Sequence, residues 1–171
     1  SRDLVAVYAG NTNFAGSTSP QIGYTTDPAP TSIAITGFSP SAIVVGEPVT
    51  VSFDVDGGTG PIGGTVSIVA TLGGNTETCT GAAVNPADGL GSCVFSVPEG
   101  RGIELSGSWS FVASFVPAVD GNEDASTSAA ANLTVSRAST GLVLSSDPAP
   151  STFGGSFSLI ATVTAAAPSE G

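Results

Sequence analysis

The sequence contains no histidine, no lysine and no methionine. Without histidine, a Ser-His-Asp triad, a Cys-His dyad and a His-ligated zinc site are excluded within these 171 residues. Without lysine, Schiff-base chemistry, a phosphate-binding P-loop lysine and a Lys–Asn isopeptide crosslink are excluded as well. The sequence also has no Gly-x-Ser-x-Gly motif. We therefore expect a protein that is not an enzyme.

Positive charge is equally scarce. Arg2, Arg101 and Arg137 are the only cations, against fourteen Asp and Glu residues, which gives a formal net charge of −11. So few cations cannot neutralise a phosphate backbone, which argues against nucleic acid as a partner. No apolar run approaches the roughly 18 residues of a membrane-spanning helix, so we expect no membrane insertion in this segment.

The residues that are present favour β-strands. Valine, threonine, serine, alanine and glycine dominate, leucine is scarce, and the helix formers lysine, methionine and glutamine are absent or nearly so. Apolar and polar residues alternate over 49–55 and over 109–115, where Trp109 shares one face with two phenylalanines, so we expect Trp109 in a core. Further strands are expected at 64–72, 91–97 and 130–136. Short strands separated by glycine, proline and asparagine turns indicate an all-β fold of the β-sandwich type.

The sequence also repeats itself with a period of about 109 residues. The matching segments are Leu4–Tyr8 with Phe111–Phe115, Ala15–Ser19 with Asp124–Ser128, Thr31–Ile35 with Thr140–Leu144, and Gly46–Phe53 with Gly155–Thr162. We predict one complete repeat at 30–137, the last hairpin of a preceding repeat at 1–29 and the first strands of a following repeat at 138–171. The chain begins at Ser1 with no Met or signal peptide, so we expect a mature product or a part of a longer protein.

The first of these segments carries a recognisable motif. Residues 8–19 read Tyr-Ala-Gly-Asn-Thr-Asn-Phe-Ala-Gly-Ser-Thr-Ser, and Tyr8, Gly10, Asn11 and Phe14 are its characteristic positions. This segment resembles the closing signature of bacterial immunoglobulin-like domains, which occur in tandem in large secreted and cell-surface proteins. Residues 61–66, Pro-Ile-Gly-Gly-Thr-Val, resemble a second step of the same family. The resemblance implies immunoglobulin-like β-sandwich repeats at a bacterial cell surface.

Cys79 and Cys93 are the only two cysteines. A zinc or redox role is disfavoured because two ligands without histidine or a Cys-x-x-Cys motif are too few. We predict a disulfide that staples a hairpin around the loop 80–92, which would contribute roughly 3 kcal/mol. The family that the sequence resembles often has a cysteine pair at this place. A disulfide implies an oxidising compartment, in agreement with an extracellular or cell-surface location.

Two further places offer candidate sites. Asp120, Glu123 and Asp124 form an acidic turn that could bind calcium, the only cofactor that the sequence suggests, although the sequence favours a simple solvated turn at this place. The segments 27–31 and 137–141 are expected to join consecutive repeats through the linker residues Asp27, Pro28, Pro30 and Arg137. Proline at this place fixes the backbone and stiffens the linker.

Three functions are compatible with these features. The first is a non-catalytic structural repeat of an extracellular stalk or surface fibre, whose partners are neighbouring repeats in the same chain. The second is a self-assembling filament subunit, completed by strand addition from adjacent subunits. The third is an adhesin module that binds a host or glycan ligand at the surface through the loops 56–63, 80–92 or 116–126.

Overall fold

The computed structural model describes residues 2–57, 61–96, 102–118, 123–147, 149–150 and 152–165. All regular elements among these residues are β-strands, so the expected all-β class is confirmed. None of the described residues belongs to a helix that is long and apolar enough to cross a membrane.

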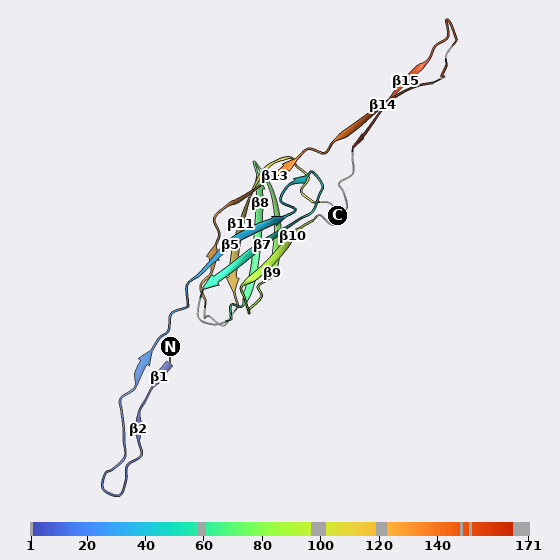
Figure 1. Ribbon diagram of the computed structural model, residues 1–171. Helices are drawn as coiled ribbons and strands as arrows, with labels where there is room; N and C mark the ends of the chain where they lie inside the picture. The colour runs from blue at the N-terminus through green and yellow to red at the C-terminus, as the bar shows by residue number, and fades with distance from the viewer. Residues whose placement is uncertain are drawn as a thin grey trace.

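A central body, residues 31–136, holds two sheets (Figure 1). One has three strands in the order β10-β7-β5, and the other has six, in the order β6-β13-β11-β8-β9 with β12 paired to β11. The strands are β5 (Thr31–Ser39), β6 (Ile43–Val44), β7 (Val49–Gly57), β8 (Gly64–Leu72), β9 (Asn75–Ala83), β10 (Leu90–Phe95), β11 (Gly107–Pro117), β12 (Ser126–Thr127) and β13 (Ala131–Ser136). Neighbouring strands are antiparallel except β6 and β13, which run parallel.

The core lies between the two sheets and follows from period-2 alternation. The clearest case is β7, where Val49, Val51, Phe53 and Val55 are all buried. Trp109 is buried, as predicted, and its indole Nε1 donates a hydrogen bond to Leu105 O at 2.9 Å.

Aromatic contacts join the two sheets. The ring of Phe111 on β11 meets Phe38 of β5 and Phe95 of β10 edge to face, with centroids 5.0 and 5.3 Å apart. Such edge-to-face pairs are favoured because the positive ring edge faces the negative π-face. Two facing sheets around one apolar core are compatible with a β-sandwich.

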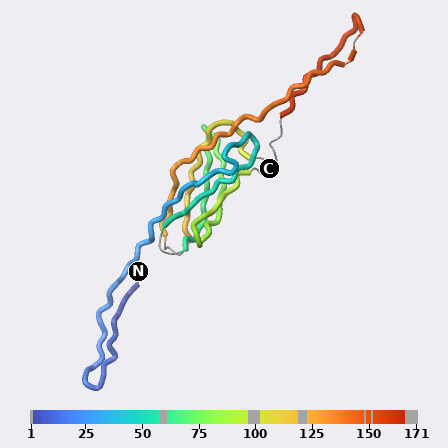
Figure 2. The backbone as a smooth tube through the Cα atoms, in the orientation of Figure 1, coloured from blue at the N-terminus to red at the C-terminus, as the bar shows by residue number. Residues whose placement is uncertain are grey.

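Two hairpins extend from opposite ends of the central body (Figures 1 and 2). The N-terminal hairpin, residues 2–24, contains β1 (Arg2–Leu4), β2 (Val7–Tyr8), β3 (Ser17–Thr18) and β4 (Ile22–Tyr24), in which β1 pairs with β4 and β2 with β3. The C-terminal hairpin, residues 140–165, pairs β14 (Thr140–Asp147) with β15 (Ser158–Ala165). Except for the half-buried Gly10, every described residue of the two hairpins is exposed.

One predicted loop is wrong. The cysteine spacing predicts a loop over 80–92, but β9 continues to Ala83 and β10 begins at Leu90, so the connection covers only 84–89. The strand β9 lies at the edge of its sheet and has only a few half-buried positions. Its residues are therefore mostly polar and include Gly81, and they show no alternation of apolar and polar residues that would predict a strand.

Candidate functional site

The turn of the N-terminal hairpin is built by the residues of the sequence motif. The Oδ1 atom of Asn11 accepts hydrogen bonds from the backbone N–H groups of Asn13 and Phe14, both at 2.9 Å. The N–H of Asn11 donates to Phe14 O at 2.8 Å. Gly10 has φ +80°, and a Cβ there would lie 2.6 Å from the backbone N of Gly16. Gly10 and Asn11 therefore shape the turn, and they leave the side chains of Tyr8 and Phe14 exposed.

The strands of the N-terminal hairpin pair in the same register as the last strands of the central body. Val7 faces Thr18 in the hairpin, and Ser114 faces Thr127 in the central body. Likewise Leu4 faces Ile22, and Phe111 faces Ala131. In both cases the first residues of the two pairs are 107 positions apart in the sequence, and the second residues are 109 positions apart. These are the same two spacings as in the sequence match.

A pair of hydrogen bonds repeats with the register. In the hairpin, Ala6 N–H donates to Ser19 Oγ at 3.0 Å, and Ser19 N–H donates to Ala6 O at 2.9 Å. In the central body, Ala113 N–H donates to Ser128 Oγ at 2.9 Å, and Ser128 N–H donates to Ala113 O at 2.8 Å. The hairpin therefore reproduces the geometry of β11 with β12 and β13, without the opposite sheet that buries them.

The C-terminal hairpin corresponds to β5 and β7, with one correction. Leu142 takes the place of Ile33, and their cross-strand partners are Val163 and Val55, which are 108 positions apart. The predicted match of Gly46–Phe53 to Gly155–Thr162, at a spacing of 109, is therefore wrong by one residue. A shift of one residue turns every side chain of a strand to the other face of the sheet. Only the spacing of 108 places the apolar residues of β15 at the positions of the buried residues of β7.

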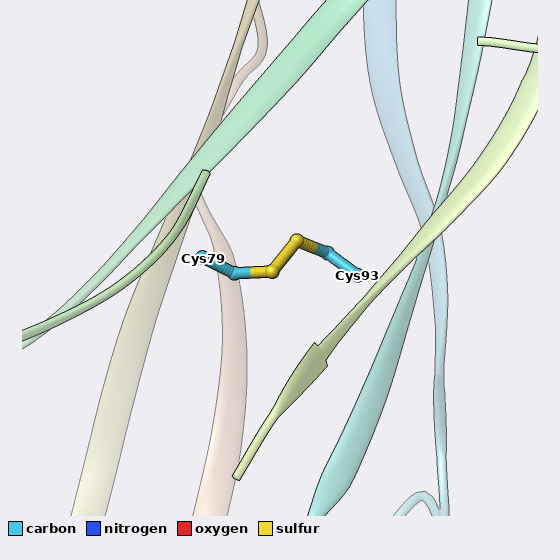
Figure 3. Close-up of a disulfide and its surroundings, with 2 residues drawn as sticks. All are labelled: Cys79 and Cys93. Atoms are coloured by element: carbon cyan, nitrogen blue, oxygen red, sulfur yellow. A yellow bond between two sulfur atoms is a disulfide. The ribbon is translucent and has the colours of Figure 1, made fainter. Parts of the chain in front are cut away.

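The disulfide is present, but it does not staple a hairpin. Cys79 lies on β9 of the six-stranded sheet and Cys93 on β10 of the three-stranded sheet, and their Cα atoms are 6.2 Å apart (Figure 3). Both strands are edge strands on the same side of the central body, so the bond joins the two sheets. The number of residues between two cysteines does not show whether they lie on the two strands of one hairpin or on strands of two different sheets. A structural disulfide of this kind indicates a protein outside the cytoplasm.

The opposite side of the central body is closed by hydrogen bonds around Thr31. Its hydroxyl donates to Asp124 O at 2.7 Å and lies 2.9 Å from Ser126 Oγ. Just before it, Ala29 forms a parallel bridge with Glu123, and Asp124 N–H donates to Ala29 O at 2.9 Å. The linker that contains Asp27, Pro28 and Pro30 is thus fastened to the central body at its last residues, whereas Arg137 directly follows β13 at the other end.

The acidic turn remains a prediction. Asp120 lies outside the described residues, while Glu123 forms the bridge to Ala29 and Asp124 directly follows it. One carboxylate oxygen of Glu123, Oε2, is buried without a hydrogen-bond partner. Within the described ranges, no group of three or more Asp, Glu, His or Cys residues is placed to hold a metal ion.

No protein-family model matches the chain, and no curated protein matches it either.

Proposed function

We propose that this chain is a non-catalytic part of an extracellular array of immunoglobulin-like β-sandwich repeats that serves as a structural stalk or surface fibre. The shared register of the N-terminal hairpin and of β11 with β12 and β13 carries the proposal, because a hairpin built to this pattern needs a second sheet. On this proposal residues 30–137 are one complete repeat, and each hairpin belongs to a neighbouring repeat.

The exposed apolar side chains support this division. Tyr8 is 48% exposed and Tyr24 is 56% exposed, whereas Phe115 and Leu133, at the matching positions of the central body, are 1% and 3% exposed. An aromatic side chain of this size gains roughly 1.5–3 kcal/mol when it is fully buried. The N-terminal hairpin therefore has an apolar face that the other strands of a complete repeat would bury.

The linker is compatible with a structural role in a stalk or fibre. Backbone and hydroxyl hydrogen bonds hold Ala29 and Thr31 against residues 123–126, and Pro28 and Pro30 restrict the backbone beside them. A short, fastened linker limits bending between consecutive repeats. The inter-sheet disulfide adds resistance to unfolding in an oxidising environment.

The proposal is tested by giving the N-terminal hairpin the strands that it lacks. Because Leu4 corresponds to Phe111, residues 30–110 placed directly before residue 4 should restore a complete repeat in front of the chain. Hydrogen exchange should then show strong protection of the amides in 4–24, and small-angle X-ray scattering should show a rod with two bodies in line. Exposed amides over 4–24 in this chimera would refute the assignment.

A matched control uses the same strands in the wrong phase. Placing residues 30–111 before residue 4 adds one residue at the junction and turns the apolar row of the hairpin outward. This control should leave the amides of 4–24 less protected than in the first chimera. Equal protection in both chimeras would indicate nonspecific collapse in place of a repeat.

A further inference from the structure

The outward side of the six-stranded sheet has no charge on its four longest strands. The strands β8, β9, β11 and β13 contain one charged residue, Glu77 of β9. Glu77 pairs with Ala70, which is fully buried, so the side chain of Glu77 lies on the inward side of the sheet. The side chains of these strands that point away from the core are all neutral: serine, threonine, valine, alanine and asparagine. We call this surface the uncharged face.

The uncharged face has an apolar centre between rows of hydroxyl groups. Val69 of β8 pairs with Val112 of β11, and the side chain of Val69 is 36% exposed. The neighbouring pairs on either side of these valines carry hydroxyl groups: Thr71 with Ser110, and Ser67 with Ser114. An apolar centre with neutral polar neighbours and few charges is the usual composition of a surface that binds another protein.

The strand pattern itself does not exclude charge from such a face. With the spacing of 107 residues, Asp3 of the N-terminal hairpin occupies the position of Ser110, so the same place holds a carboxylate there. On the outward side of the three-stranded sheet, Asp54 and Asp56 of β7 alternate with buried residues and therefore point away from the core. The central body thus lacks charge on one of its two outward sides only.

We propose that the uncharged face binds the uncharged face of a second copy of this chain, sheet against sheet. Two copies with a net charge of −11 each repel one another wherever their carboxylates come close. Contact through the uncharged face brings no like charges together, whereas contact through the other sheet would bring Asp54 and Asp56 against the partner. This lateral contact is separate from the end-to-end order of repeats in the proposed function.

The size of the uncharged face fits a weak but specific dimer. Four strands about 4.8 Å apart, each with about eight residues that rise about 3.3 Å, cover roughly 500 Å² on each copy. Two copies together would bury roughly 1,000 Å², which is near the lower limit for a specific interface. We therefore expect a dissociation constant between about 10 µM and 1 mM. Because the face pairs with itself, association should stop at the dimer.

Sedimentation velocity of the full chain between about 5 µM and 1 mM tests this interface. We expect the sedimentation coefficient to rise from that of a monomer toward that of a dimer. Raising the salt concentration from about 0.05 to 0.5 M should strengthen association about threefold or more. Salt screens the repulsion between the two acidic copies, and the interface has no attractive ion pair to lose. A monomer at every concentration, a continuous series of larger oligomers, or association that weakens with salt would overturn the proposal.

Two substitutions place a charge on the uncharged face. Val112→Asp puts a carboxylate at its apolar centre, and in the dimer this carboxylate would lose water close to its copy on the partner. It should weaken association by about tenfold or more. Ser110→Asp reproduces the arrangement that Asp3 already has on the N-terminal hairpin, so the strand pattern tolerates it. It lies in the row beside the centre and should weaken association by about threefold or more.

Val94→Asp is the matched control. Val94 is 53% exposed and points away from the core on β10 of the other sheet, and its substitution changes the net charge by as much as Val112→Asp does. It should keep association within about twofold of the wild type. Near-ultraviolet circular dichroism of Trp109 checks that each variant is folded, and Ser110→Asp decides the outcome if Val112→Asp does not fold. Folded variants at 110 and 112 that associate as strongly as the control would overturn this interface.

Discussion

Ser128 and Ala113 exchange two hydrogen bonds across the six-stranded sheet, at 2.8 and 2.9 Å. One of them uses the serine hydroxyl as an acceptor, where a sheet would ordinarily use a backbone carbonyl. Ser128 is the only polar residue among the described ones that is buried as a whole, so this contact is part of the core. The same exchange between Ser19 and Ala6 lies in solvent.

Because one serine is buried and the other is exposed, the same Ser→Ala substitution should change the free energy of unfolding by different amounts at the two positions. Ser128→Ala leaves the buried N–H of Ala113 without an acceptor and should lower the free energy of unfolding by about 1–3 kcal/mol. Ser19→Ala, the matched control, should change it by less than about 0.5 kcal/mol, because water can replace the hydroxyl. Urea titration followed by tryptophan fluorescence measures both. Equal effects would show that the two contacts have the same environment.

The disulfide predicts a stability that depends on redox state. Reduction of the Cys79–Cys93 bond, which closes a short loop with a sequence separation of 14, should lower the free energy of unfolding by roughly 3 kcal/mol. Urea titrations with and without a reductant provide the measurement. The double variant Cys79→Ser, Cys93→Ser serves as the control, since a reductant should not alter its unfolding. A reduced chain as stable as the oxidised one would contradict a structural role for the bond.

Gly91 on β10 leaves space for a core aromatic ring, which predicts a penalty for any added side chain. It pairs with Phe53 of β7, and a Cβ at this position would lie 2.3 Å from the Phe53 ring. Gly91→Ala should therefore cost about 1–3 kcal/mol in unfolding free energy through overpacking. The neighbouring Ser92 faces away from the core, so Ser92→Ala should be nearly neutral. Thermal melts of both variants make the comparison, and an unchanged Gly91→Ala would show that the ring can move aside.

Much of the architecture follows from the pattern of the sequence. Alternation over 49–55 and 109–115 marks the two strands that hold the centre of the core, because a half-buried strand needs one apolar face. The repeat spacings of 107 and 109 correspond to the registers of the N-terminal hairpin, since residues that face each other must be replaced together.

Other features could not be obtained from the pattern. The strand β9 has few buried residues because it lies at an edge, so hydrophobic alternation gives a weak signal there. The location of Cys79 and Cys93 in different sheets depends on a crossover that the spacing of two cysteines does not specify. The predicted match of 46–53 to 155–162 is off by one residue because Ser, Thr, Ala and Val recur so often that adjacent alignments look alike.

The exposure of both hairpins predicts that the central body folds without them. Residues 30–137 alone include both sheets, the disulfide and the hydroxyl hydrogen bonds of Thr31, and of these contacts they lose only those of Ala29, so their melting temperature should equal that of the full chain within about 2 °C. Substitutions give a matched comparison within the full chain. Tyr8→Ser should leave the unfolding free energy unchanged in dilute solution, whereas Phe115→Ser, at the corresponding buried position, should abolish or strongly weaken folding. Calorimetry of the truncated chain and urea titration of the two variants measure these effects. A truncated chain that melts much lower, or a destabilising Tyr8→Ser, would mean that the N-terminal hairpin packs on the central body of its own chain.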